Sequence, residues 1–192
     1  GAFPLDVVTA VTLESPTGVE SIQMMDADFV EAQLRSTLKA YRVRAIKSGM
    51  LGNTEIVRRV AQVLAEYPDI PYVLDPVLRS TSGTALLEPD GVAVLRSLLM
   101  PRATVTTPNL DELEILCEGA DDVFEAAAQL ASACRQSILV KGGHATGPDC
   151  EDWLFYPDGR RYCFCAKRIE TRNTRGTGCA LSALIAAYLA WK

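Results

Sequence analysis

Apolar residues recur along this chain in two alternating patterns. One is a short apolar run rich in β-branched residues, typical of a buried strand, and the other repeats apolar residues at helical spacing. The runs predict strands over 6–13, 43–49, 71–75, 103–107 and 137–142, and the spacing predicts helices over 29–41, 54–67, 90–100, 109–118 and 121–135. This alternation predicts a three-layer α/β/α fold with a mostly parallel, doubly wound sheet.

Three further local signals refine this prediction. Thr54 is the expected N-cap of the second helix. Residues 152–166 predict a β-hairpin that turns at 157–159, and residues 173–190 read as a glycine-rich loop leading into an apolar helix. We find no repeat, low-complexity tract or linker, so residues 1–192 are expected to form a single domain.

The composition and net charge indicate which class of molecule the protein binds. The 192 residues are 48% hydrophobic, which is ample for a core, and carry a net charge of -5. That charge argues against binding to nucleic acid or to an anionic membrane, because both need a basic face. There is no run long and apolar enough to span a bilayer, and the N-terminus lacks the order of a signal peptide. We therefore expect a soluble, cytoplasmic protein that acts on a small molecule.

The six cysteines fit the same compartment. They show no CxxC pair and no disulfide spacing, so reduced thiols are expected. Cys163 and Cys165 would share one face of a strand, where burial is a simpler explanation than a zinc site. Cys117 and Cys134 are expected in the core.

Polar residues gather where the predicted strands end, which is where ligands bind in parallel sheets. The segments are Lys47–Met50, Asp75–Val77, Thr107–Asn109 and Lys141–His144. Asp75 ends a buried strand, so its carboxylate is expected to have a cation or hydrogen-bond donors beside it. Asn109 and Glu112 also have the spacing of a capping box. His144, the only histidine, is expected to be a loop or packing residue.

The loop 176-GTGC-179 leads into a helix N-terminus. Glycines let backbone N–H groups converge there, and the helix dipole adds positive potential, so an anion is expected to bind. The spacing alone also fits a plain helix cap, and the loop is neither a Walker A motif nor a GxGxxG fingerprint.

The order of these pieces resembles the hydroxymethylpyrimidine and hydroxymethylpyrimidine phosphate kinases of thiamin biosynthesis, which belong to the ribokinase-like superfamily. The resemblance covers essentially the whole chain. It is carried by AIKSGMLGNTEIV, VLDPVLRSTSGTALL, TTPNLDELEIL, ILVKGGH and NTRGTGCALSA. It implies phosphoryl transfer from ATP, with Mg²⁺, to a pyrimidine. The given residues do not include the family's first strand, its Gly-rich substrate loop or its C-terminal helices, so we expect either a fragment of a longer protein or a shortened homologue. Without that strand, residues 6–13 would form an apolar sheet edge, so either association through this region, as a homodimer, or additional residues outside the given sequence are expected.

The resemblance also implies roles for individual residues. Amides of Gly176 and Gly178 would hold the transferred phosphoryl group, and Cys179 would act as a base or orient the acceptor hydroxyl, its thiol pKa lowered by the helix N-terminus. The residues expected to bind the nucleotide and its metal are Asp75, Asn109, Glu112, Lys141, Thr174 and Thr177. Of these, Asp75 and Glu112 are the candidate Mg²⁺ sites, with Glu112 acting through water. Glu14, Gly49 and Met50 are expected on the substrate side.

Two positions differ from the resembling kinases. At Glu14 those kinases have a Gln that hydrogen-bonds the aminopyrimidine edge, and a carboxylate offers acceptors only. We therefore expect altered pyrimidine specificity, a buried carboxylate with a raised pKa, or a solvated side chain. Arg175 stands where many members have His and could contact a phosphate. Two alternatives stay open: a vitamin kinase for pyridoxine-like substrates, against which Cys179 argues in part, and a non-catalytic relative.

Overall fold

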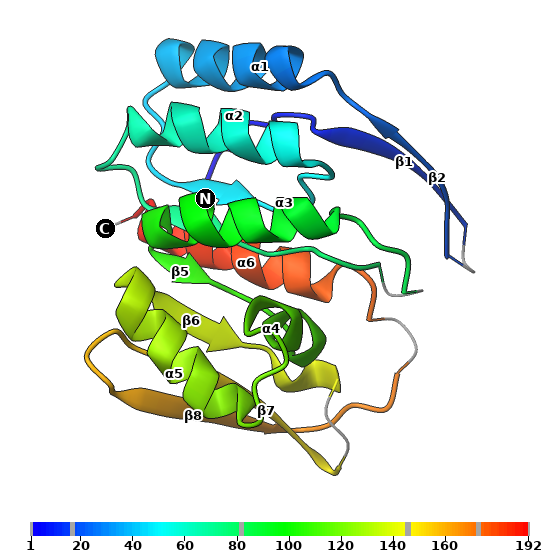
Figure 1. The fold of residues 1–192 in the computed structure, drawn as a ribbon, viewed down its shortest axis with the longest axis vertical. Coiled ribbons are helices and arrows are strands. Elements are labelled where there is room, and N and C mark those ends of the chain that lie inside the picture. The colour runs from blue at the N-terminus through cyan, green and yellow to red at the C-terminus, as the bar shows by residue number, and fades with distance from the viewer. Residues whose placement is uncertain (1, 16–17, 81–82, 145–146, 172–173, 192) are drawn as a thin grey trace.

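A computed structural model describes residues 2–15, 18–80, 83–144, 147–171 and 174–191. A six-stranded sheet forms its middle layer (Figure 1). The first four strands run parallel, and the last two add an antiparallel hairpin. In spatial order they are β3 (Ile46–Ser48), β4 (Tyr72–Leu74), β5 (Val105–Thr106), β6 (Ser137–Val140), β7 (Asp149–Phe155) and β8 (Arg161–Lys167). The expected three-layer fold with a mostly parallel sheet is confirmed.

Helices cover both faces of this sheet. The strand order advances in one direction, and right-handed crossovers then place the connecting helices on one face. These helices are α2 (Thr54–Ala65), α3 (Pro89–Val94) with its extensions η1 (Leu95–Leu99) and η2 (Met100–Arg102), α4 (Leu110–Leu116) and α5 (Val123–Cys134). Outside them, α1 (Ala27–Ala40) packs on α2, and α6 (Thr177–Leu189) covers the opposite face (Figure 1). A short 3-10 turn, η3 (Gly142–His144), follows β6.

The core is divided by the sheet into two clusters. In β4 the side chains of Tyr72 and Leu74 join the larger cluster beneath α2 to α5, while Val73 joins the smaller cluster beneath α6. This alternation follows from the two-residue period of a strand. Because both faces of β4 are buried, its run of apolar residues is continuous, which is why the sequence predicted it so clearly.

The N-terminal strand differs from its prediction. The strand β1 (Ala10–Ser15) pairs only with β2 (Gly18–Met24), in a hairpin outside the six-stranded sheet (Figure 1). The strand expected over 6–13 therefore starts later than predicted, and β2 was not predicted. The expectation that 6–13 forms an edge of the main sheet was wrong, because β3 occupies that edge.

Two local predictions also needed correction. Asn53, rather than Thr54, caps α2, because its side chain accepts a hydrogen bond of 2.9 Å from the Ile56 N–H. Cys163 and Cys165 lie in β8, whose seven residues are all exposed, so their expected burial was wrong. The hairpin turn at 157–159 is confirmed, with Gly159 at a φ of 86°.

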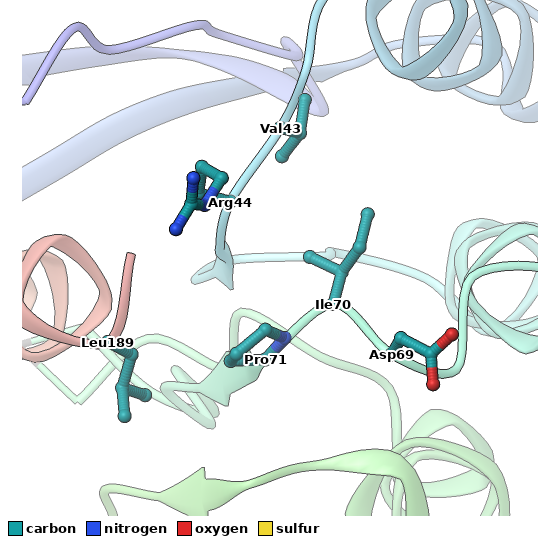
Figure 2. Close-up of a pocket in the computed structure, with 6 residues that line it drawn as sticks. All are labelled: Val43, Arg44, Asp69, Ile70, Pro71 and Leu189. Carbon is teal, nitrogen blue, oxygen red and sulfur yellow. The ribbon is translucent and has the colours of Figure 1, made fainter. Parts of the chain in front are cut away.

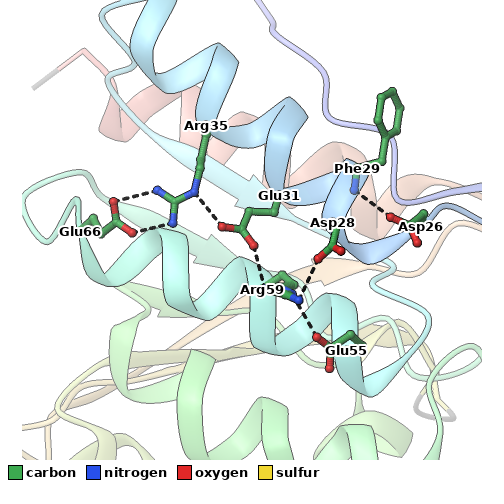
Figure 3. A network of polar contacts seen from close by, with 8 residues as sticks. All are labelled: Asp26, Asp28, Phe29, Glu31, Arg35, Glu55, Arg59 and Glu66. Carbon is green, nitrogen blue, oxygen red and sulfur yellow. Dashed lines mark hydrogen bonds and ion pairs between the residues drawn. The ribbon is translucent and has the colours of Figure 1, made fainter.

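A charged network joins α1 to α2 (Figure 3). Arg35 donates to both carboxylate oxygens of Glu66, and Arg59 lies 2.7 Å from Asp28 and 3.3 Å from Glu31. Exposed pairs of this kind contribute at most about 1 kcal/mol each. The packing of α1 therefore depends mainly on its buried face, which consists of Val30, Leu34 and Leu38.

The described residues contain neither a membrane-spanning helix nor a ready-made metal site. None of their helices is long and apolar enough to cross a membrane. Nor do three His, Cys, Asp or Glu side chains among them gather as a ready-made metal site.

Candidate active site

Asp75 is the centre of the candidate site. It follows β4 at the carboxyl end of the sheet and is only 1% exposed. Its Oδ1 accepts hydrogen bonds from Lys141 Nζ at 2.9 Å and from the Thr107 hydroxyl at 3.2 Å. Its Oδ2 accepts one from the Ser182 hydroxyl at 3.0 Å and lies 3.7 Å from Lys47 Nζ. The expectation that this buried carboxylate has cations and donors beside it is confirmed.

The two lysines that flank Asp75 each lie over a glycine. A Cβ atom added at Gly178 would stand 3.1 Å from Lys141 Nζ, and one added at Gly49 would stand 2.9 Å from Lys47 Nζ. The glycines thus leave the room that the two ammonium groups occupy. Gly178 belongs to the first turn of α6 and Gly49 follows β3. The arrangement therefore joins the helix α6 and the central sheet at one carboxylate.

Glu112 lies beside the same lysine but has a second, structural role. Its carboxylate is 3.8 Å from Lys141 Nζ, and it accepts a 2.8 Å hydrogen bond from the Asn109 N–H. The Asn109 side chain in turn accepts from the Glu112 N–H, so the capping box of α4 is formed. Burial raises the pKa of Glu112, and the charge of Lys141 partly offsets this.

The two carboxylates differ in how well they suit a magnesium ion. Direct coordination by Asp75 does not fit, because its two oxygens already accept three hydrogen bonds and the ammonium of Lys47 lies 3.7 Å away. Lys141 also occupies the space between Asp75 and Glu112 where a bridging cation would sit. Coordination through water at Glu112 fits better, since Mg²⁺ usually keeps several waters.

The N-terminus of α6 faces this cluster. Gly176 is the N-cap at a φ of 79°, a left-handed conformation that favours glycine, and no side chain among the described residues caps the helix. The Thr177 hydroxyl donates instead to the carbonyl oxygen of Thr174 at 2.8 Å. The amides of the first turn therefore have no side-chain partner at the cap, as an anion site requires. Asn173 lies outside the described residues.

Cys179 lies in the first turn of α6, and its thiol differs from the prediction. Partial burial of the sulfur raises its pKa, and the negative charge of Asp75 adds to this, while Lys47 and Lys141 act in the opposite direction. The expected lowering by the helix N-terminus was therefore wrong. Ser182, one turn further on, ties the helix to the cluster by donating to both the Cys179 carbonyl and Asp75.

Glu14 and Arg175, the two positions that differ from the resembling kinases, contact each other. Arg175 Nη1 lies 3.2 Å from the Glu14 carboxylate and donates to the Ser15 carbonyl at 3.1 Å. Both side chains are exposed, so the hypothesis of a buried Glu14 was wrong. The contact links the end of β1 to the loop that precedes α6.

The other substrate-side residues lie in separate places. Met50 lines an open pocket of about 340 Å³ between β2 and the segment 85–89, and its carbonyl accepts from the Thr9 hydroxyl at 2.7 Å. Gly49 and Glu14 do not line that pocket. A second pocket, of about 300 Å³, lies near the amino ends of β3 and β4, between Arg44, Asp69 and Leu189 (Figure 2). It contains none of the predicted site residues.

Sequence reasoning missed three members of the cluster. Lys47 and Thr107 lie inside the strand-end segments and Ser182 lies inside the predicted apolar helix, but the sequence pattern predicts no role for any of them. A polar residue in the stretch ALSAL, one turn after Cys179, was the available signal for Ser182. For Lys47 the signal was a charged residue inside a short strand.

The chain is similar to kinases of known family over nearly its whole length. A family model described as phosphomethylpyrimidine kinase matches residues 1–192. The hydroxymethylpyrimidine/phosphomethylpyrimidine kinase of Escherichia coli is 40% identical over 192 residues, which cover 97% of this chain and 72% of that protein. A thiamine biosynthesis multifunctional protein of Corynebacterium efficiens is 39% identical over 98% of this chain, which spans only 26% of that protein. The ADP complex of Bacillus subtilis pyridoxal kinase superposes with a TM-score of 0.86 at 29% identity, covering 96% of this chain and 72% of that one.

Proposed function

The chain belongs to the phosphomethylpyrimidine kinase family, and we propose that it transfers the γ-phosphoryl group of ATP to hydroxymethylpyrimidine, to its monophosphate, or to both. The observation that carries the proposal is the pair of ammonium groups held by Asp75 next to the uncapped N-terminus of α6. Phosphoryl transfer depends mostly on positioning and on neutralising charge on the transferred group. Fixed cations beside helix amides that no described side chain caps supply both.

Each residue then has a defined task. The amides of Gly176 and Gly178 bind the oxygens of the transferred group, flanked by Thr174 and Thr177 on the nucleotide side. Lys141 neutralises the nucleotide phosphates, and Asp75 orients this lysine. Cys179 orients the acceptor hydroxyl or takes its proton. Because burial raises the pKa of the thiol, the protonated form dominates at neutral pH, which favours the orienting role.

In this proposal fewer side chains hold magnesium than the sequence indicated. When bound, Mg²⁺ would neutralise charge on the phosphate oxygens. Glu112, next to Asn109, is the side chain we propose to hold it through water. Asp75 is proposed to organise the two lysines rather than to coordinate the metal.

A second candidate is phosphorylation of a pyridoxine-like substrate. It is favoured by the close superposition on Bacillus subtilis pyridoxal kinase. A side-by-side assay with ATP and Mg²⁺ of hydroxymethylpyrimidine, its monophosphate and pyridoxine separates the candidates. We expect either pyrimidine to be used at least tenfold better than pyridoxine. Turnover of pyridoxine alone, or of none of the three, would contradict the proposed function.

Glu14→Gln tests the substrate side. The change restores a side chain with one donor and one acceptor, which matches an amino group beside an unprotonated ring nitrogen. We expect kcat/KM for hydroxymethylpyrimidine to rise by about threefold to tenfold, the scale of one neutral hydrogen bond. Arg175→Gln is the matched control, since it breaks the same ion pair but leaves Glu14 in place. Identical kinetics for Glu14→Gln and the unchanged protein would show that Glu14 does not touch the substrate.

We also propose that the chain forms a homodimer through the β1–β2 hairpin. Val11 and Leu13 lie on one face of this hairpin, are 58% and 60% exposed, and belong to a strand that pairs with none in the main sheet. Light scattering after size exclusion should give a dimer, and Val11→Lys with Leu13→Lys should give a monomer. Leu184→Lys, at an exposed site on α6, is the control that should stay dimeric. A monomeric unchanged protein would contradict the proposal.

The cytoplasm is the compartment we propose for this activity. The reaction consumes ATP, and all six cysteines are free thiols.

A further inference from the structure

Lys47 carries a partly buried positive charge, and the proposed reaction assigns it no role. Its side chain is 21% exposed and extends from the middle of β3 toward Asp75. Yet Lys47 Nζ is 3.7 Å from the nearest Asp75 oxygen, beyond hydrogen-bond range, whereas Lys141 Nζ hydrogen-bonds the other oxygen at 2.9 Å. Within the described residues no hydrogen bond from Lys47 Nζ is found, so its donors are available to a ligand.

The two lysines lie on different sides of the Asp75 carboxylate. Lys141 lies over Gly178 and beside Glu112, on the side assigned to the nucleotide. Lys47 lies over Gly49, and the next residue, Met50, lines the pocket between β2 and residues 85–89. Its charge also acts on the thiol of Cys179. Lys47 therefore lies beside Gly49 and acts on the thiol of Cys179, the group proposed to orient the acceptor.

We propose that Lys47 binds the acceptor group of the substrate and that it serves a phosphate acceptor much more than a hydroxyl acceptor. The inference rests on the proposed function. A hydroxymethyl oxygen is neutral and needs only to be oriented, whereas the phosphate of the monophosphate is a dianion that approaches another highly charged phosphate chain. A fixed ammonium on the acceptor side offsets that repulsion, because charge-assisted hydrogen bonds to phosphate are strong.

The bond changes in the two steps are closely similar. With the hydroxyl acceptor, its oxygen forms a bond to the γ-phosphorus, the bond from that phosphorus to the bridging oxygen breaks, and ADP leaves with the electron pair while the hydroxyl proton passes to water. With the phosphate acceptor, an already ionised oxygen forms the same bond and ADP leaves in the same way, but no proton has to be removed. The second step therefore depends less on Cys179 and more on the neutralising charge of Lys47.

Lys47→Met tests this, because it keeps most of the length of the side chain and removes the charge. We expect kcat/KM with the monophosphate to fall by about 30-fold and kcat/KM with hydroxymethylpyrimidine to fall by no more than about threefold. The KM for ATP should stay within about twofold. Lys47→Arg keeps a cation and should restore much of the ratio between the two acceptors. Lys167→Met removes an exposed lysine on β8 and should change neither acceptor.

A binding measurement separates this role from a structural one. Calorimetric titration without ATP should show that Lys47→Met weakens binding of the monophosphate by about tenfold and leaves hydroxymethylpyrimidine unaffected. Equal losses for both acceptors, or a raised KM for ATP alone, would overturn the assignment of Lys47 to the acceptor. If the unchanged protein phosphorylates neither pyrimidine, both the proposed function and this inference are wrong. If it uses pyrimidines but the ratio does not move in Lys47→Met, only the inference fails.

Discussion

Gly178→Val is expected to lower kcat by about 10³-fold, the scale of removing a positioned donor for a developing negative charge, with little loss of stability. The new Cβ would stand 3.1 Å from Lys141 Nζ, and the added methyl groups would crowd the amides of the first turn of α6. The lysine end is flexible and can move aside, and Gly178 does not have the positive φ that would strain a valine. The damage should therefore fall on phosphate binding rather than on folding.

Single-turnover rates and thermal unfolding, measured on the same samples, check this prediction. Ala183→Val is the matched control, because it adds bulk at an exposed position of the same helix. Gly178→Ala, with its smaller group, should show an intermediate loss. A normal turnover rate in Gly178→Val would show that no phosphoryl group is held at this helix N-terminus.

Cys179→Ala is expected to slow phosphoryl transfer to hydroxymethylpyrimidine by about 10²-fold and to leave nucleotide affinity nearly unchanged. The thiol lies among Asp75 and the two lysines but belongs to none of the proposed nucleotide contacts. Cys179→Ser, which keeps a hydrogen-bonding group, should retain part of the rate if the thiol orients the hydroxyl. Cys163→Ala, on the exposed strand β8, is the control.

The pH dependence of Cys179 follows from the direction of its pKa. Burial raises that pKa above its ordinary value of 9.0, so the thiolate is the minor form at neutral pH and grows as the pH rises. If the thiolate takes the hydroxyl proton, kcat should climb with pH through this range, and the climb should vanish in Cys179→Ala. An orienting thiol gives a flat profile at neutral pH instead. A rate constant that is unchanged in Cys179→Ala would mean that the thiol only packs.

Most local features of the site could be predicted, because they depend on residues that are close in sequence. The capping box of Asn109 and Glu112 spans four residues, and the glycine loop of α6 spans four more. Asp75 was predicted to need partners because burial of its strand could be read from the adjacent apolar run. What these predictions lacked was the identity of the partners, since Thr107 and Ser182 are 32 and 107 residues away.

Features that depend on several groups far apart in the sequence could not be predicted. The helix N-terminus alone would lower the pKa of Cys179, but burial and Asp75 outweigh it, and both reach the thiol only through the tertiary fold. Likewise the local β-branched run correctly indicated a strand near residue 10. It did not indicate that this strand pairs outside the main sheet, with the more polar residues of β2.

The sequence by itself determined the alternation of strands and helices, the three-layer fold and the segments that end at the site, because periodicity and capping act over a few residues. Only the tertiary structure decided that Lys47 and Lys141 approach different oxygens of Asp75, and that Arg175 contacts Glu14, 161 residues away in the sequence. The physical reason is that short-range patterns select elements, whereas the direction of each side chain depends on how those elements pack. The chemistry of this site depends on those side-chain directions, and therefore on the packing of the elements.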